Sequence, residues 1–353
     1  MDPLSSPALK IILRFTLFTL VVVAAVVGFR SYQVYWQPNV RHFAEPVYLE
    51  IPTGTTFPEL VDLLERKLLL LDSETFLRAA DLLEFQKEPV RTGRFAVRGG
   101  MNNQDLIDHL RDGKQAPVDV TLTHGWLVED VAAKAARFIE PDSAELMRAM
   151  RDTTLLHELG FDTTTLMAMF VPNTYELFWN TPPADFLRRM RKEYDRFWAR
   201  DERSQKAETQ NLSPVEVYTL ASILERETRH HPEKPRMAGV YLNRLRTSGW
   251  KLQADPTSVF ARRDFTTRRV TQYHLRFDSP YNTYVYSGLP PGPISMAGIP
   301  SIDAVLNPEA HDYFFFVSRG DDSGAHNFSE TLAGHKQNIK IYKRNRRKRA
   351  AQR

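Results

Sequence analysis

A carboxylate at the edge of an apolar helical face is the feature of this chain that most strongly indicates chemistry. Residues 213–228 predict a helix with a well-defined start, because Ser213 and Glu216 form a capping box and Pro214 takes the first helical position. In that register Glu225 borders the apolar stripe. A carboxyl group removed from water keeps its proton to higher pH, so we expect Glu225 to have a raised pKa and to act as a general acid.

Spacing alone leaves a second interpretation of this helix open. In that alternative, Glu225 forms a buried ion pair with a neighbouring arginine, namely Arg226, Arg229 or Arg244. Glu227 lies two residues further along and points about 200° around the helix, which favours a structural or ion-pairing role for it.

The N-terminal residues predict a membrane anchor. Residues 10–30 are almost entirely apolar, and a helix over residues 11–29 extends about 28 Å, close to the thickness of a bilayer core. No clean small-residue cleavage site follows, which favours an uncleaved anchor over a signal peptide. We expect residues 1–9 to form a tail, 10–30 the anchor and 31–46 a linker, and the flanking charges are too balanced to decide the orientation.

Charge is distributed unevenly along the chain. The net charge is +4, from 47 basic and 43 acidic residues, and the stretch 340–353 is strongly basic without any acidic residue. The remainder is mildly acidic and carries no nucleic-acid motif, so nucleic acid is not an expected partner. We expect residues 341–353 to be a basic disordered tail, and the chain has no cysteine.

A repeated pattern indicates strand-turn-helix units. Gly54, Gly100 and Gly125 each follow a short apolar stretch, and each precedes an amphipathic helix at the same spacing. Such units resemble LysM-like modules, which bind glycans that contain N-acetylglucosamine; the alternative is an ordinary packing unit. The expected fold is α+β, with a LysM-like module over residues 47–120 and a mixed helical and β catalytic domain over residues 121–340.

Three stiff loops follow the helix that carries Glu225. Residues 252–257, 279–284 and 287–294 are rich in proline, glycine, amide and hydroxyl side chains. Rigid loops lose little entropy on binding, and such side chains suit the hydroxyl and acetamido groups of a sugar polymer. The candidate substrate-binding residues are Gln253, Tyr281, Asn282, Thr283 and Tyr284.

These segments together resemble a known family. The sequences Ala221-Ser-Ile-Leu-Glu-Arg-Glu-Thr228, Tyr241-Leu-Asn-Arg-Leu245, Leu252-Gln-Ala-Asp-Pro-Thr257, Ser279-Pro-Tyr-Asn-Thr-Tyr284, Gly288-Leu-Pro-Pro-Gly-Pro-Ile294 and Ala325-His-Asn-Phe328 resemble, in order, the signature of the endolytic murein transglycosylases of the MltG (YceG-like) family. The resemblance runs from about residue 45 to 340. The chain departs from the usual family pattern at His124-Gly125, where most members have Glu-Gly.

The resemblance implies a single-pass protein of the cell inner membrane, with residues 1–9 as a cytoplasmic tail and a periplasmic C-terminal domain. It also implies a lyase that cuts nascent peptidoglycan between N-acetylmuramic acid and N-acetylglucosamine, leaves a 1,6-anhydromuramyl end and so limits strand length. Peptidoglycan synthases of the inner membrane are the implied protein partners.

Under this hypothesis one carboxyl group serves twice. Glu225 would protonate the glycosidic oxygen and then accept the proton of the C6 hydroxyl that attacks C1, so that no second carboxylate, metal or other cofactor is required. Asp255 is a candidate for a supporting role, and His326 for a place in the cleft. No His-Glu-x-x-His pattern accompanies His230 and His231, which argues against a zinc site.

Two other classes of function stay open. A conventional glycan hydrolase would pair Glu225 with Asp255 and release reducing ends. A noncatalytic scaffold would bind peptidoglycan through the repeated modules and tether synthases.

Overall fold

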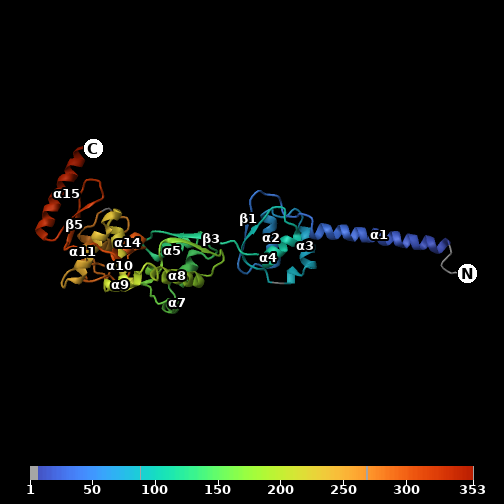
Figure 1. The fold of residues 1–353 in the computed structure, drawn as a ribbon, viewed down its shortest axis with the longest axis horizontal. Helices are drawn as coiled ribbons and strands as arrows, with labels where there is room; N and C mark the ends of the chain where they lie inside the picture. The colour runs from blue at the N-terminus through green and yellow to red at the C-terminus, as the bar shows by residue number, and fades with distance from the viewer. Residues whose placement is uncertain (1–6, 88, 268, 353) are drawn as a thin grey trace. The chain divides into compact units, whose positions relative to one another are not determined.

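The structure is a computed structural model that describes residues 7–87, 89–267 and 269–352. It forms two compact units: residues 1–118 with 177–180, and residues 119–176 with 181–353 (Figure 1). Helices and short antiparallel strands alternate in both, as the α+β prediction requires. Each unit is described by itself below.

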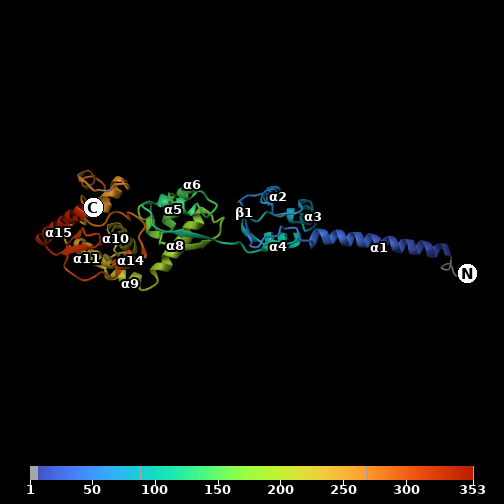
Figure 2. The ribbon, with the colours of Figure 1, turned by 90° about the horizontal axis from the view of Figure 1, so that it is seen from above.

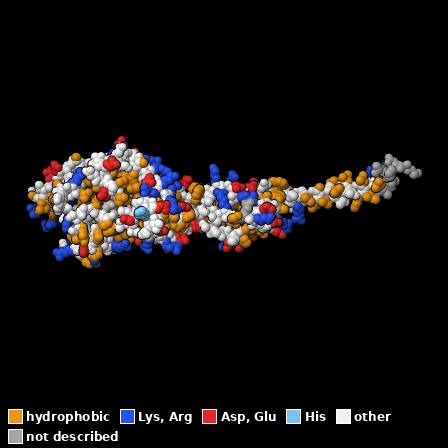
Figure 3. All heavy atoms as spheres, turned by 90° about the horizontal axis from the view of Figure 1, so that it is seen from below, with side chains coloured by type: hydrophobic (Ala, Val, Ile, Leu, Met, Phe, Trp, Pro, Cys, Tyr) orange, Lys and Arg blue, Asp and Glu red, His pale blue; other side chains and the backbone are white. Residues whose placement is uncertain are grey.

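The first unit begins with a long apolar helix, α1 (Pro7–Tyr35). By length and composition it is able to cross a membrane, and hydrophobic side chains cover its length (Figure 3). The helix continues five residues past the expected end at residue 30, into the segment predicted as a linker. Its last turn is held by the domain, because Val34 is buried and its carbonyl oxygen accepts a hydrogen bond from Asn103 Nδ2 at 2.8 Å.

The core of the first unit lies between a two-stranded sheet and three helices. Strands β1 (Val47–Ile51) and β2 (Gly93–Val97) pair antiparallel, with the fully buried Leu49 opposite Phe95. Helices α2 (Phe57–Arg66) and α3 (Ser73–Leu82), the short helix η2 (Phe85–Lys87) and helix α4 (Asn103–Asp112) complete this unit. Along the chain, α2, α3 and η2 lie between the paired strands β1 and β2.

The three predicted strand-turn-helix units exist, but they are not equivalent. Gly54 and Gly100 both adopt a left-handed backbone, with φ of +84° and +77°. Gly125 does not; instead, a Cβ on it would lie 3.0 Å from the Cβ of Asp130, so glycine is favoured there by close packing. The strands of the first two units pair with each other, whereas β3 (Val118–Leu122) pairs with β4 (Asn173–Leu177).

The second unit contains two groups of elements. The first consists of β3, β4 and the helices α5 (Val128–Ala135), α6 (Ser143–Ala149), α7 (Thr153–Glu158), η3 (Leu166–Met169), α8 (Pro183–Trp198) and α9 (Arg203–Thr209). The second consists of α10 (Pro214–Glu227), η4 (His231–Glu233), α11 (Lys234–Arg246), α12 (Asp255–Arg262), α13 (Gln272–Leu275), α14 (Ile299–Leu306), β5 (Phe315–Ser318), β6 (His326–Ser329) and α15 (Leu332–Gln352).

Helix α10 is the centre of the second group (Figure 2). Its predicted start is confirmed, since Ser213 caps the helix and Glu216 completes the capping box. Residues 217–224 are all buried, and the helix packs against α11, α12 and α14. The predicted apolar stripe is therefore only part of its buried surface, because neighbouring helices cover several faces.

The C-terminal residues differ from the sequence prediction. Residues 341–352 belong to helix α15, which packs on β5 and β6, so the prediction of a disordered tail was wrong for this part of the chain. The physical reason is a stripe of contacts at helical spacing. Tyr342 lies against Gly320, and Asn345 Nδ2 donates to the carbonyl oxygen of Arg319 at 2.8 Å.

Candidate active site

Helix α10 ends with two glutamates that lie in different surroundings. The carboxylate of Glu225 accepts a hydrogen bond from Lys234 Nζ at 2.8 Å and another from the hydroxyl of Ser301. Lys234 is only 1% exposed and also donates to Ser301 Oγ at 2.8 Å. Since Ser301 lies in the first turn of α14, Glu225 joins α10, α11 and the N-terminus of α14.

These contacts contradict the predicted protonation of Glu225. Burial by itself raises its pKa, but the hydrogen bonds from Lys234 and Ser301 and the charge of Lys234 outweigh it, so the pKa is lowered below its usual value. Glu225 is therefore a carboxylate at neutral pH. The ion-pair alternative was correct in kind, but the partner is a lysine at the start of the next helix rather than an arginine.

Glu227 has the environment that the sequence analysis had assigned to Glu225. The pKa of Glu227 is raised to about 7 as the net result of four effects: burial, the largest, raises it, the hydrogen bond from Tyr241 lowers it, the nearby charge of Asp255 raises it and the charge of Arg244 lowers it. Tyr241 Oη donates to Glu227 Oε1 at 2.5 Å and so fixes the carboxyl group. A carboxyl group with a pKa near neutrality can both donate and accept a proton, as general acid and base catalysis requires.

Three segments bring the partners of Glu227 together. Tyr241 and Arg244 lie on α11, in the sequence 241–245 that carried part of the family resemblance. Asp255 opens α12, and its Oδ1 accepts a hydrogen bond from Tyr284 Oη at 2.6 Å. Burial, followed by this hydrogen bond and the charge of Asp255, raises the pKa of Tyr284. The convergence of two predicted loops on one carboxyl group agrees with the sequence, although that group is Glu227.

Arg244 is a buried member of the cluster around Glu227 and holds neighbouring backbone segments in place. It is 7% exposed, and its guanidinium donates to the carbonyl oxygens of Phe314 at 2.8 Å and Leu252 at 2.5 Å. Its charge favours the ionised form of Glu227, while its hydrogen bonds hold the segment that leads into Asp255. The sequence analysis missed Arg244 as a site residue because it considered the arginine only as an ion-pair partner of Glu225.

Two predicted sugar-binding residues instead hold the loops in place. Asn282 is fully buried, and its amide nitrogen donates to the carbonyl oxygens of His274, Leu275 and Phe277. Thr283 is 1% exposed and shares a hydrogen bond of 2.8 Å with Thr257 Oγ1. Direct contact of either side chain with a sugar is therefore ruled out in this structure, since the polar atoms already bind protein groups inside the core.

Two other predicted residues are accessible. Gln253 is exposed, adopts a left-handed backbone with φ of +51°, and its backbone nitrogen donates to the carbonyl oxygen of Thr283. Tyr281 is partly exposed and packs on Phe260, with ring centroids 4.8 Å apart. Tyr281 lines a cavity of about 420 Å³ together with Trp126 and Phe260. Their contact with substrate stays a prediction.

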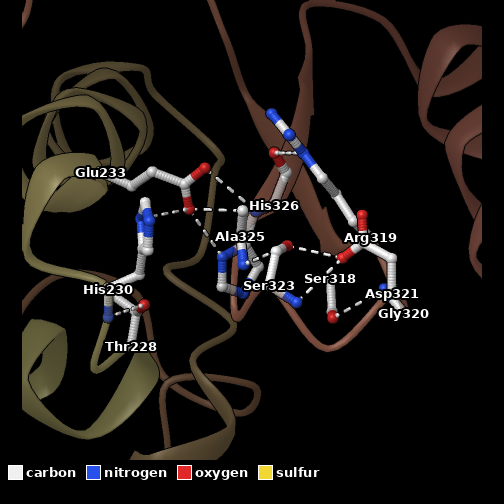
Figure 4. A network of polar contacts seen from close by, with 10 residues as sticks. All are labelled: Thr228, His230, Glu233, Ser318, Arg319, Gly320, Asp321, Ser323, Ala325 and His326. Carbon is white, nitrogen blue, oxygen red and sulfur yellow. Dashed lines mark hydrogen bonds and ion pairs between the residues drawn. The ribbon is translucent and has the colours of Figure 1, made fainter.

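His326 belongs to a polar network that joins β6 to η4 (Figure 4). Its Nδ1 lies 3.1 Å from Glu233 Oε2, and its backbone nitrogen donates to the same carboxylate at 3.0 Å. His230 Nδ1 lies 3.7 Å from that oxygen. Glu233 is 7% exposed, so these contacts anchor the β5–β6 hairpin from inside the protein. The structure gives His326 a structural partner, and its predicted place in the cleft stays a prediction.

Metal ligation has no candidate in the part of the chain that the structure describes. No group of three or more histidine, cysteine, aspartate or glutamate side chains lies close enough together to hold an ion. The groups that act on Glu227 are a second carboxylate, a tyrosine hydroxyl and the guanidinium of Arg244.

A carboxyl group with a pKa near neutrality, here beside Tyr241 and Tyr284, is the kind of group that enzymes use to cleave glycosidic bonds. The chain belongs to the YceG-like family, whose model matches residues 49–341. It is 26% identical over 320 residues to a Bacillus subtilis protein named endolytic murein transglycosylase, covering 85% of each chain. This membership confirms the family resemblance drawn from the motifs.

Two further proteins are similar. A Streptococcus pneumoniae protein of the same name is 24% identical over 302 residues, which cover 77% of this chain and 54% of that protein. The crystal structure of a protein described as YceG-like, from Listeria monocytogenes, superposes with a TM-score of 0.55 and 25% identity, over 84% of this chain and 99% of that one. The mixed helix and strand architecture is therefore shared with a solved structure.

Proposed function

We propose that the chain is an endolytic peptidoglycan lytic transglycosylase in which Glu227 is the general acid and base. The relatives named endolytic murein transglycosylases support the reaction class. The observation that carries the assignment of the residue is the carboxyl group of Glu227, which Tyr241 Oη holds through a hydrogen bond of 2.5 Å and whose pKa is raised to about 7, mainly by burial, beside a neighbour, Glu225, whose pKa is lowered.

In the first step, protonated Glu227 donates its proton to the glycosidic oxygen between N-acetylmuramic acid and N-acetylglucosamine. The bond from that oxygen to C1 of the muramic ring breaks, and an oxocarbenium-like state develops at C1. Burial keeps enough of Glu227 protonated at neutral pH to make this step possible.

In the second step, the Glu227 carboxylate accepts the proton of the C6 hydroxyl of the same muramic ring. The C6 oxygen attacks C1 and forms the 1,6-anhydro bond, and Glu227 regains the proton that it had donated. Tyr241 holds the carboxyl group in place through its hydrogen bond of 2.5 Å. The Asp255 carboxylate, oriented by Tyr284, adds negative charge that stabilises the oxocarbenium-like state.

The test is the chemistry of the product ends. Full-length protein incubated with peptidoglycan should release strands that carry 1,6-anhydromuramyl ends, detected by mass spectrometry of muropeptides. Glu227→Gln should lower the rate by about a thousandfold or more, because it removes both proton transfers. Undiminished cleavage by this variant would exclude Glu227 as the acid.

One alternative follows from the charge of Asp255 acting on Glu227. Two neighbouring carboxyl groups are the equipment of a glycan hydrolase, with Asp255 as the second group. Reducing ends in place of anhydro ends would select it. Unchanged strand lengths with wild-type protein would instead favour a noncatalytic scaffold that binds peptidoglycan.

Membrane attachment and glycan binding by the first unit complete the proposal. The apolar helix α1 would anchor the chain in the inner membrane, with both units in the periplasm and within reach of peptidoglycan synthases. The turn between β1 and α2 borders a cavity of about 310 Å³, lined by Pro52, Gly54 and Glu59 among others. This cavity is our candidate for the glycan site of a LysM-like module. Removal of residues 1–30, which keeps the buried Val34 in the core, should release the protein from membranes, which fractionation would show.

A further inference from the structure

The cavity beside Tyr281 is not used by the mechanism above, and it is chemically unlike the cluster around Glu227. Nine of the fourteen residues that line it are apolar or aromatic, among them Trp126, Met147, Met150, Met167, Phe260 and Tyr281. Glu129, Arg151, Thr163, Thr164 and Arg263 supply the polar groups. Its volume of about 420 Å³ is in the range of sites that hold small ligands.

The wall of this cavity is preformed. Trp126, Phe265, Phe260 and Tyr281 follow one another in contact, with centroid separations of 4.8, 6.2 and 4.8 Å. The loop that contains Gly292 and Pro293 lies directly on the turn at Thr164, since a Cβ on Gly292 would come within 2.0 Å of the Thr164 carbonyl oxygen. A rigid cavity binds without an ordering cost.

The lining discriminates between the two parts of a peptidoglycan strand. A sugar ring carries hydroxyl groups around its edge, and methionine side chains would leave those hydroxyls without hydrogen-bond partners at a cost in free energy. Methyl side chains such as those of alanine match the same surface. The stem peptides attached to muramic acid combine methyl side chains with free carboxylates, so they fit this cavity better than the glycan does.

One arginine is available for a carboxylate. Arg151 is paired with Glu129 at 3.6 Å, and the Asp162 carboxylate near Tyr281 accepts hydrogen bonds from the backbone nitrogens of Thr164 and Thr165. Arg263 is exposed, lines the cavity and forms no ion pair with any carboxylate in the part of the chain that the structure describes. Its guanidinium can therefore bind an anionic group of the ligand.

The cavity lies at a suitable distance from the reacting bond. Helix α12 begins at Asp255, in the Glu227 cluster, and Arg263 follows its end in the cavity wall. Eight residues of helix correspond to about 12 Å. An extended peptide covers about 3.3 Å per residue, so three or four residues attached to the muramic ring at Glu227 reach the cavity.

Building on the proposed function, we propose that this cavity binds the stem peptide of the muramic acid residue at the cleavage site, with Arg263 contacting one of its carboxylates. The enzyme would then prefer strands that still carry stem peptides over strands from which an amidase has removed them.

The experiment compares the kcat/KM of full-length protein on stem-bearing and amidase-treated strands, measured as anhydromuramyl ends formed. Wild-type protein should prefer stem-bearing strands, and Arg263→Glu should reduce the ratio of the two values about three- to five-fold, as expected for the loss of one exposed charge contact. Met147→Asn should reduce the ratio without a change of charge. Arg276→Glu, an exposed arginine outside the cavity, is the matched control and should leave the ratio unchanged.

A wild-type ratio near one, or a ratio that Arg263→Glu and Met147→Asn both leave unchanged, would overturn the proposal. Equal losses on both kinds of strand would mean that the cavity holds sugar instead. Calorimetric binding of the amidase-released stem peptide to full-length Glu227→Gln protein, weakened by Arg263→Glu, supplies a readout that does not depend on catalysis. If wild-type protein forms anhydro ends on neither kind of strand, the proposed function itself fails.

Discussion

Glu225 and Glu227 lie two residues apart on one helix and differ in what surrounds their carboxyl groups. Glu225 faces a buried ammonium group and a helix N-terminus, and its pKa is lowered. Glu227 faces a tyrosine hydroxyl and the charge of a second carboxylate, and its pKa is raised to about 7. The comparison shows that burial alone does not make a carboxyl group an acid, because the paired charge decides which protonation state burial favours.

The sharpest test of this comparison exchanges each carboxyl group for an amide. Glu227→Gln should lower the rate of cleavage by about a thousandfold or more, whereas Glu225→Gln should retain most of the activity of its folded fraction. Rates of anhydromuramyl end formation, corrected for the folded fraction by circular dichroism, give the answer. The comparison is wrong if Glu225→Gln is the inactive protein.

For the free energy of unfolding, Glu225 should matter more than it does for the rate of cleavage. Glu225→Gln leaves the buried Lys234 without its counter-charge and should lower the free energy of unfolding by about 2 kcal/mol. The lowered pKa of Glu225 means that its contribution is present above pH 4.5, the ordinary value, and is lost as pH falls below it.

The contribution of Glu227 to the free energy of unfolding depends on pH in the opposite direction to that of Glu225. Its contribution to stability is complete below pH 4.5 and is lost as pH rises through about 7, because the folded protein holds the proton that the unfolded chain releases. Glu227→Gln should therefore unfold at higher denaturant concentration than wild type at pH 8. Equal midpoints at pH 8 for the wild type and Glu227→Gln would contradict the raised pKa.

The pH dependence of cleavage should respond in opposite directions to the loss of two neighbours of Glu227, Tyr241 and Asp255. Activity should fall as pH rises through about 7, since the acid form is required. Tyr241→Phe removes a hydrogen bond that favours the carboxylate, so the pH at which activity falls should rise by about one unit or less. Asp255→Asn removes a negative charge, so the pH at which activity falls should decrease by about one unit or less. If both variants moved this pH in the same direction, Glu227 would not be the group that controls the loss of activity.

The smallest expected effect concerns the Glu225 side alone. A Cβ on Gly298 would lie 3.1 Å from Glu225 Oε2, so Gly298→Ala should press on the ion pair and lower stability by less than about 1 kcal/mol. The pH at which activity falls should not change. A shift of that pH would show that the two carboxyl environments are coupled.

The sequence predicted the helix, but the carboxyl group with the raised pKa lies two residues beyond the one that the apolar stripe singled out. Capping residues and Pro214 defined α10, and Asp255 of the motif at 252–257 begins α12 and raises the pKa of Glu227 through its charge. The apolar stripe of one helix says nothing of what other helices place against its end. Lys234 and Ser301 reach Glu225 from α11 and α14, and these contacts depend on tertiary packing.

Polar residues in the loops show the same limit. Asn282 and Gln253 have similar side chains in similar proline-rich segments, yet one binds three backbone carbonyl groups in the core and the other is exposed. Composition predicted that the segments were rigid, but it did not show that Asn282 and Thr283 produce that rigidity. The order of α15 was likewise not predicted, because its contacts are made with the β5–β6 hairpin rather than within the basic segment.

The final turn of α1 belongs both to the apolar helix and to the folded core of the first unit, since Val34 is buried and its carbonyl oxygen accepts a hydrogen bond from Asn103. The junction between α1 and this core therefore has no flexible hinge. If α1 is embedded in a bilayer, any tilt of this helix must carry the β1–β2 sheet with it. Under the proposed function, the orientation of α1 in the lipid would therefore set the orientation in which the first unit meets a glycan strand.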